Sequence, residues 1–228
     1  MAKRRGRKPF PRKEKKKYEG DKVLIICEGT NTEPNYFNAL KEFLKLNPLS
    51  IRVHPAKGRF SPQVLVDFAI SKIEEACAEG DPFAKAYCVI DRDNHPTYEE
   101  AFEKARAYQP SEKCSTVLCL IPSVPCFEYW ILMHEKYTNR PFGSSGFKPC
   151  DELIDSELPG YSKTDRLALK QLIETKLEQA KKNGKRSHME HQTLGSNSYT
   201  TVYLLVEELE YLKENIIFDD DCKGCPDV

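Results

Sequence analysis

The sequence predicts an α/β fold in which a central parallel sheet is flanked by helices and followed by a helical C-terminal extension. Two observations favour this fold. Up to residue 122, short apolar, β-branched runs alternate with amphipathic segments, and strands joined in this way pair in parallel through crossover helices. Beyond residue 122 the apolar spacing is helical. With 228 residues, the chain is long enough to bury a sizeable core.

The first four elements have recognisable boundaries. Residues 22–28 form an apolar run that ends before a glycine, the pattern of a strand buried on both faces. Residues 32–46 carry apolar side chains at helical spacing, begin with Thr-Glu-Pro and stop at Asn-Pro. A short second strand is expected at residues 50–54. The next helix begins with the Ser-Pro of residues 61–62 and closes at the Gly-Asp-Pro of residues 80–82.

The remaining elements continue the alternation. A third strand at residues 84–90 runs directly into Asp91, and a helix at residues 98–107 precedes a fourth strand at residues 116–121. Further helices are expected at residues 125–137, 167–182 and 200–214. The sequence therefore predicts a basic disordered arm (residues 1–19), a domain with the parallel sheet (20–122), a helical extension packed on it (123–216) and an acidic flexible tail (217–228).

The neutral total charge hides an uneven distribution. The chain has 35 basic and 35 acidic side chains, yet the first 17 residues alone carry a net charge of +9. Two prolines and a block of like charge favour disorder in this arm. Such an arm either neutralises nucleic-acid phosphates without reading bases, or only keeps the chain soluble.

Composition also excludes several classes of protein. No apolar stretch approaches the roughly 20 residues of a membrane span, and the basic start lacks the apolar run of a secretory signal. Nine cysteines, an odd number without the spacing of a disulfide framework, indicate a reducing compartment in which most pack as small hydrophobic side chains. We expect a soluble, cytoplasmic protein with no membrane partner.

Three carboxylates follow predicted strands. Glu28 ends the first strand, and Asp91 and Asp93 end the third. In an open parallel sheet the carboxyl ends of the strands meet at the edge where ligands bind. Oxygen ligands without His or Cys suit Mg²⁺ or Mn²⁺, so the pattern predicts a metal site; two solvated acidic loops are the alternative.

The residues around these carboxylates resemble a known family. Ile26-Cys27-Glu28-Gly29 and Val89-Ile90-Asp91-Arg92-Asp93 look like the Glu and Asp-x-Asp motifs of TOPRIM domains, which occur in topoisomerases, primases and OLD-family nucleases. Together with Pro125–His134 and Ser196–Tyr203, they resemble the RloB family, TOPRIM-like proteins associated with restriction loci and abortive phage infection in bacteria and archaea. The resemblance spans roughly residues 20–215. The last motif departs from the family's frequent Asn-Pro-Ser-Thr pattern, because residues 196–199 of this chain are Ser-Asn-Ser-Tyr.

The resemblance implies a TOPRIM-like topology and a divalent-metal-dependent nuclease of a prokaryotic anti-phage system. It assigns metal binding to Glu28, Asp91 and Asp93, where the glutamate also serves acid-base roles in TOPRIM nucleases. Whether DNA or RNA is the substrate stays open. The chain lacks a phosphate-binding P-loop, so nucleotide sensing would need a partner ATPase or sensor chain. The apolar helices are compatible with a homodimer.

Further acidic and histidine side chains are candidates with two interpretations each. Glu33 begins a helix, where the dipole favours it, or joins a second metal site. Glu128 lies in an apolar helix and needs a cation or donors, in the site or in a structural ion pair. His95 either contacts phosphate or protonates a leaving oxygen, or is an ordinary turn residue. His134 is expected to be a satisfied core or surface histidine.

Loop cations and one His-Cys set complete the candidates. Lys57, Arg59 and Lys163 either hold a phosphate or lie on the solvated surface. The set His188, His191, Cys222 and Cys225 either binds zinc or ends in a frayed C-terminus.

Two rival functions remain. The chain could be a non-catalytic nucleic-acid-binding or phage-sensing module of a partner effector, which would be indifferent to metal. It could also use the same carboxylates on a small nucleotide.

Overall fold

The computed structural model describes residues 22–48, 50–56, 61–93, 95–111, 114–143, 146, 148–195 and 198–214. The basic arm expected at residues 1–19 and the acidic tail expected at residues 217–228 lie outside this part of the chain. The candidate residues Lys57, Arg59, Cys222 and Cys225 lie outside it as well.

The described residues form a five-stranded sheet and seven helices. In chain order the elements are β1 (Val23–Cys27), α1 (Thr32–Phe43), β2 (Ile51–Pro55), α2 (Pro62–Ala78), β3 (Lys85–Asp91), α3 (Tyr98–Ala107), β4 (Val117–Val124), α4 (Glu128–Glu135), α5 (Pro149–Glu157), α6 (Arg166–Leu194), β5 (Tyr199–Thr200) and α7 (Val202–Glu214). The strand order is β2-β1-β3-β4-β5, with β1 to β4 parallel and β5 antiparallel to β4. The predicted α/β fold with a largely parallel sheet is confirmed.

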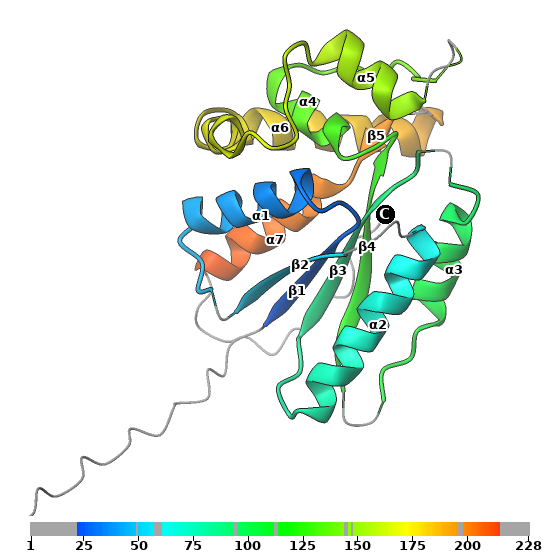
Figure 1. The fold of residues 1–228 in the computed structure, drawn as a ribbon, viewed down its shortest axis with the longest axis vertical. Helices are drawn as coiled ribbons and strands as arrows, with labels where there is room; N and C mark the ends of the chain where they lie inside the picture. Colours follow the sequence, from blue (N-terminus) through cyan, green and yellow to red (C-terminus); the bar gives the residue numbers. More distant parts are fainter. Residues whose placement is uncertain are drawn as a thin grey trace, which may run out of the picture.

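The helices form layers around the sheet. Figure 1 shows α1 and α7 on one face, called here the α1 face, and α2 and α3 on the other, the α2 face. Helices α4, α5 and α6 lie beyond the carboxyl ends of β1, β3 and β4, so they cover the edge at which the candidate carboxylates were expected (Figure 1). No helix in the described ranges is long and apolar enough to span a membrane.

The sheet is buried on both faces, as the uninterrupted apolar runs predict. Ile25 and Val89 belong to the core on the α1 face, while Ile26 and Ile90 belong to the core on the α2 face. Successive side chains of a strand point to opposite faces, so one apolar run serves both cores. Burying each such side chain contributes about 2 kcal/mol.

Some boundaries differ from the prediction, with identifiable causes. Helix α6 continues past residue 182 to Leu194, through Asn183 and Gly184, which sequence rules treat as helix breakers. A Cβ on Gly184 would lie 3.0 Å from the Trp130 ring, so close packing of α6 on α4 favours glycine here despite its low helix propensity. Gly195, with φ of 68°, then ends the helix in the left-handed conformation.

Two elements were missed. Helix α5 has Pro149 in its first turn and acidic residues behind it, and its apolar residues Cys150, Leu153 and Ile154 are at helical spacing, but the segment is only nine residues long and was not recognised as a helix. Strand β5 consists of two residues that pair with Ser123 and Val124 of β4. Because β5 has only two residues, it is too short to show the alternation of apolar and polar residues that predicts a strand.

The expectation for the cysteines is wrong for at least five of them, because Cys119 and the members of two described pairs are disulfide-bonded. Cys77 is bonded to Cys114, and Cys126 is bonded to Cys150. Cys27 and Cys88 are unpaired and buried, as expected for small hydrophobic side chains. Spacing along the chain could not show these pairs, because the bonded cysteines are 37 and 24 residues apart and meet only through the tertiary fold.

Candidate metal centre

Five carboxylates gather at the carboxyl edge of the sheet, and we call this group the acidic rim. Its members are Glu28, Glu33, Asp91, Asp93 and Glu128. Strands β1 and β3 are adjacent and parallel with Cys27 opposite Val89, which brings the ends of both strands to the same edge. The backbone N–H of Asp91 donates to Oε2 of Glu28 over 3.3 Å. The structure thus brings the first strand's glutamate to the third strand's aspartate, as the sequence predicted.

Asp93 turns back toward the segment after β4. Its backbone has a positive φ of 33°, a conformation that aspartate tolerates better than most residues. Its N–H donates to the carbonyl of Pro125 over 2.8 Å, which fixes the loop after β3 against the start of the next segment. Its negative charge raises the pKa of Glu28, which places it in the same electrostatic group.

Glu33 lies in the rim as well as at a helix start. Its Oε1 accepts a hydrogen bond of 2.9 Å from the N–H of Gly29, and only 6 % of the residue is exposed. A Cβ at position 29 would come within 2.3 Å of the Glu33 carboxylate, so glycine is required for this approach. The turn after β1 therefore holds Glu33 against the strand end.

Glu128 enters the rim from α4, with only 3 % of the residue exposed. Its Oε1 accepts from Thr32 Oγ1 at 3.1 Å and pairs with Lys163 Nζ at 3.2 Å. Tyr161 donates in turn to Thr32 over 3.3 Å. The donors that a buried glutamate needs are thus present, and one of them is the predicted loop cation Lys163, which lies at the rim although its side chain is 53 % exposed.

Burial and mutual repulsion raise the pKa values of three carboxylates of the rim. Burial raises the pKa of Asp91 well above its usual value, and the charges of Glu33, Glu28 and Glu128 raise it further. Burial also raises the pKa of Glu33, and the charge of Glu128 adds to it. The pKa of Glu28 rises to about 7, mainly through burial and against the hydrogen bond from Asp91. A cation bound among these groups would offset the repulsion.

Lys163 supplies one positive charge to the rim. Burial lowers the pKa of its ammonium group, but the neighbouring Glu128, Asp91 and Glu33 outweigh that effect and raise the pKa overall. Lys163 therefore stays charged at neutral pH. One lysine cannot neutralise five carboxylates.

Two oxygens of the rim have no partner. Asp91 Oδ1 and Asp93 Oδ1 are buried, and neither has a hydrogen-bond partner. A buried polar atom in this state costs free energy and calls for an explanation. Carboxylate oxygens without competing donors are the ligands that hard cations such as Mg²⁺ and Mn²⁺ prefer. The donor set of the rim therefore fits such an ion.

The rim is not a closed cage in this structure. Within the described ranges, Cys126, Glu128 and Cys150 form the one trio whose ligand atoms all lie within 4.8 Å of one another, so no three carboxylates do so. Mg²⁺ commonly keeps several waters and binds directly to one or two carboxylates. The arrangement matches that mode, or requires side-chain rotation before three carboxylates bind together.

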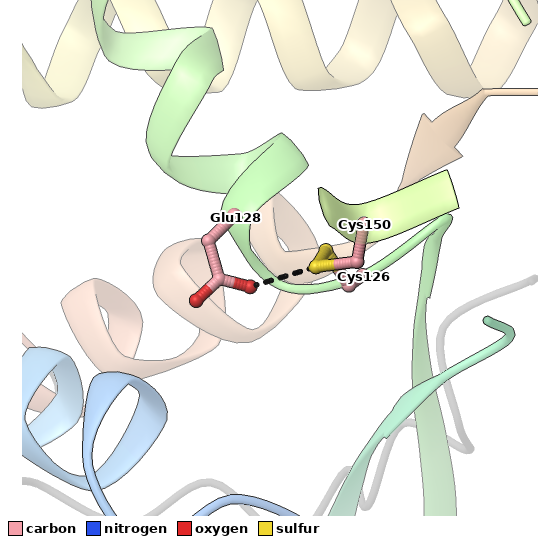
Figure 2. Close-up of side chains that lie close together, drawn as sticks. All are labelled: Cys126, Glu128 and Cys150. Atoms are coloured by element: carbon pink, nitrogen blue, oxygen red, sulfur yellow. Dashed lines mark hydrogen bonds between the residues drawn. A yellow bond between two sulfur atoms is a disulfide. The ribbon is translucent and has the colours of Figure 1, made fainter. Parts of the chain in front are cut away.

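A disulfide lies beside the rim. Figure 2 shows Cys150 bonded to Cys126, with its sulfur 3.5 Å from Oε2 of Glu128. A disulfide sulfur has no proton to donate and is not a thiolate ligand, so this trio holds no metal while the bond is intact. The bond links α5 to the segment just before α4. Sequence reasoning missed it.

The candidate histidines His95 and His134 lie in different surroundings. Nε2 of His95 lies 3.5 Å from Oε1 of Glu28, so His95 contacts the rim. His134 is fully buried in the core of the α1 face, between the Tyr36 hydroxyl at 3.2 Å and the Trp130 carbonyl at 3.1 Å. Burial lowers the pKa of His134 to about 4, so it is neutral. The expectation of a satisfied core histidine is confirmed.

Both histidines of the suggested zinc set contact tyrosine side chains. His188 Nδ1 lies 3.0 Å from the Tyr203 hydroxyl, and the His191 ring stacks on Tyr199 with a centroid distance of 3.8 Å. Neither contact needs a metal.

Comparison with known proteins identifies the family. The family model described as "RloB-like protein" matches residues 23–209, which covers every strand of the sheet and all five carboxylates of the rim. The chain has no match among curated proteins and none among solved structures. With most of its length covered by this model, the chain belongs to the RloB family.

Proposed function

We propose that this protein is a divalent-metal-dependent nuclease that cleaves DNA or RNA phosphodiester bonds in a prokaryotic anti-phage, abortive-infection system. The observation that carries the proposal is the acidic rim, in which two buried carboxylate oxygens, from Asp91 and Asp93, have no partner. The defence setting rests on membership of the RloB family and on the association stated for that family.

The residues of the rim divide into ligands and supporting groups. Glu28, Asp91 and Asp93 would hold Mg²⁺ or Mn²⁺, with Glu33 beside them. A cation held there would polarise a phosphate and stabilise the charge that develops in the transition state. Glu128 holds Lys163 at the rim through an ion pair. This arrangement positions the ammonium group to bind a phosphate oxygen.

His95 completes the proposed machinery. Its contact with Glu28 holds the imidazole at the edge of the rim, and 36 % of its side chain is exposed. A histidine in this position is suited to donate a proton to the leaving oxygen. The basic arm, Lys57 and Arg59 would add non-specific attraction for the phosphate backbone. A partner chain would supply any ATP-dependent sensing.

Metal binding and cleavage are tested in parallel. Mn²⁺ binding to the wild type, Glu28→Gln and Asp91→Asn is measured by calorimetry, and cleavage is measured on DNA, tRNA and free nucleotides. Both variants should bind Mn²⁺ at least about tenfold more weakly and lose cleavage. Asp67→Asn is the matched control, because Asp67 is an exposed carboxylate on α2 that pairs with Lys104 away from the rim.

The outcomes separate the rival functions. Cleavage that survives chelation, or full cleavage by the Glu28→Gln/Asp91→Asn double variant, would refute the proposal. Nucleic-acid binding that needs no metal and produces no cleavage would identify a sensor module. Turnover of free nucleotides alone would identify an enzyme of small-nucleotide metabolism.

A further inference from the structure

A cavity of about 290 Å³ lies beside the acidic rim, on the α2 face of the sheet. Its walls come from the loop after β3, from α3, from the end of α6 and from β5. Residues that line it include Arg92, Tyr98, Phe102, Arg106, His191 and Tyr199. None of the roles assigned above to the acidic rim uses this cavity.

The cavity and the rim share a backbone segment. Asp91 and Arg92 are consecutive, and the N–H of Arg92 donates to the Ser123 carbonyl over 3.1 Å, which continues the strand pairing. Because successive side chains alternate, Asp91 lies toward the α1 face with the rim, and Arg92 lies toward the α2 face. The Arg92 guanidinium is 5.8 Å from the centre of the Tyr98 ring. The rim and the cavity thus adjoin through the backbone that joins Asp91 to Arg92.

Flat rings form much of the cavity wall. The rings of His191 and Tyr199 are nearly parallel, with an interplanar angle of 10°. The hydroxyls of Tyr98 and Tyr199 lie 3.2 Å apart, and the Phe102 ring packs edge-on to Tyr98 at 5.2 Å. Both tyrosines are buried, so their positions are fixed before any ligand arrives. Proteins stack unpaired nucleobases on such aromatic walls.

The charges in the cavity favour a base over a phosphate. Arg92 and Arg106 contribute two positive charges, and Glu99 and Glu103 contribute two negative ones. A phosphate would meet two carboxylates, whereas a nucleobase presents both acceptors for guanidinium groups and N–H donors for carboxylates. The mixture of flat rings with balanced polar groups matches the chemistry of a base edge.

We propose that this cavity binds an unstacked nucleobase next to the phosphate held at the acidic rim. The inference rests on the proposed nuclease function and sharpens its substrate class, because a base can enter a cavity only from a single-stranded or flipped-out nucleotide. The substrate is then a nucleic acid whose nucleotide at the cleavage position is single-stranded or flipped out of the base stack.

Binding without divalent cation tests the cavity apart from cleavage. The affinity of the full-length protein is measured in EDTA for a single-stranded oligonucleotide, for copies with one abasic position each, and for the duplex. For the wild type, one abasic copy should bind about tenfold more weakly than the intact strand, since stacking of a base is lost. Nucleosides should compete for the site, and inorganic phosphate should not.

Two substitutions on exposed or partly exposed lining residues avoid the buried core. Arg106→Gln and His191→Ala should each reduce the difference between the intact and abasic strands to less than threefold. Arg186→Gln is the matched control, because Arg186 lies on the same helix as His191 but contacts Tyr137 and Glu190 instead of the cavity. It should keep the tenfold difference. Thermal unfolding of each variant checks that it is folded.

The outcomes are distinguishable from those for the nuclease proposal. Equal affinity for intact and abasic strands in the wild type would overturn the base site, whether or not the protein cleaves. Competition by phosphate but not by nucleosides would also overturn it. A base-dependent affinity in a protein that never cleaves would support the cavity and refute the nuclease.

Discussion

Two buried polar regions in the same protein differ in how their atoms are satisfied. The first is the imidazole of His134 in the core of the α1 face, where both ring nitrogens have partners, in Tyr36 and Trp130. The second is the acidic rim, where the oxygens Asp91 Oδ1 and Asp93 Oδ1 have none. His134 is fully buried and the two aspartates are only partly buried, but the atoms compared are buried in both regions, and they differ in hydrogen bonding. A satisfied buried group calls for no explanation, whereas an unsatisfied one does.

The electrostatic consequences are opposite in kind. His134 avoids its charge, because burial lowers its pKa to about 4 and it stays neutral at physiological pH. In the rim, burial and neighbouring carboxylates raise the pKa of Asp91, so charging this group is costly. Replacing Asp91 by a neutral residue should therefore raise the free energy of unfolding, whereas replacing His134 should lower it.

The largest expected effect is on Asp91→Asn. Cleavage should fall by about 10³-fold or more, since several kcal/mol of transition-state stabilisation depend on the ligand set. The melting temperature should rise by about 3 °C, which corresponds to about 1 kcal/mol of relieved repulsion in a chain of this size. His134→Ala should lower the melting temperature instead. Calorimetry of both variants, with cleavage assays, checks the pair; a destabilised Asp91→Asn would show that the carboxylate is structural.

The disulfides Cys77–Cys114 and Cys126–Cys150 should contribute similarly to stability, but only the second lies at the rim. The bonded residues are 24 and 37 positions apart, so replacing either pair by serine should cost about 3 kcal/mol of unfolding free energy by the loop-entropy estimate. Only the Cys126→Ser/Cys150→Ser protein should also lose activity, because that disulfide contacts Glu128 and anchors the helix that precedes Lys163. Urea unfolding and kinetic constants decide this; equal activity in both proteins would remove the disulfide from any role at the rim.

Acid titration should also separate the two regions. His134 in the unfolded chain takes up a proton near pH 6.5 but in the folded protein only near pH 4, so the unfolded state binds more protons between these values. Its contribution falls by about 3 kcal/mol as the pH drops through this window. Glu28 has a folded pKa of about 7, above its unfolded value near 4.5, so its contribution rises as the pH falls through that range.

The two contributions are isolated by substitution. His134→Gln should flatten the loss of unfolding free energy between pH 6.5 and pH 4, and Glu28→Gln should steepen it. Urea unfolding at intervals of half a pH unit measures both slopes. Parallel curves for the wild type and His134→Gln would contradict the assignment.

Most of the fold could be predicted because its elements have local patterns. The β1 run is apolar with a glycine after it, and α3 was placed at residues 98–107, where the structure has it. The failures occur where tertiary contacts override local preference. Helix α6 continues through Gly184 because close packing against Trp130 of α4 outweighs the low helix propensity of glycine. Strand β5 is defined only by its pairing with β4.

The site could be predicted in part. Glu28 and Asp91 were placed together because parallel strands end at one edge. For Glu33, Glu128 and His95 the sequence left two interpretations each, since it could not show the contacts with Gly29, Lys163 and Glu28. The cavity beside Arg92 was not foreseen at all. Its lining comes from segments that are more than 80 residues apart in sequence, and no motif joins them.

The smallest expected effect is that of Tyr36→Phe, which tests whether an unpaired buried polar atom lowers the stability of this protein. Tyr36→Phe removes the partner of His134 Nε2 and leaves a buried nitrogen unsatisfied, which should cost about 2 kcal/mol of unfolding free energy. Tyr211→Phe, on an exposed side chain of α7, is the control and should change less than about 0.5 kcal/mol. Adding His134→Leu to Tyr36→Phe should cost less than the sum of the single changes, since both polar groups are then gone.

Urea unfolding of the wild type, the two single variants, the double variant and the Tyr211→Phe control decides whether this core penalises an unpaired polar atom. If Tyr36→Phe is as stable as the wild type, an unsatisfied nitrogen is tolerated in this interior at no measurable cost. The unpartnered oxygens of Asp91 and Asp93 would then need no cation to explain them. If the expected loss is found, the same penalty applies at the rim in the absence of a ligand. Binding of Mg²⁺ or Mn²⁺ should then raise the melting temperature of the wild type more than that of Asp91→Asn.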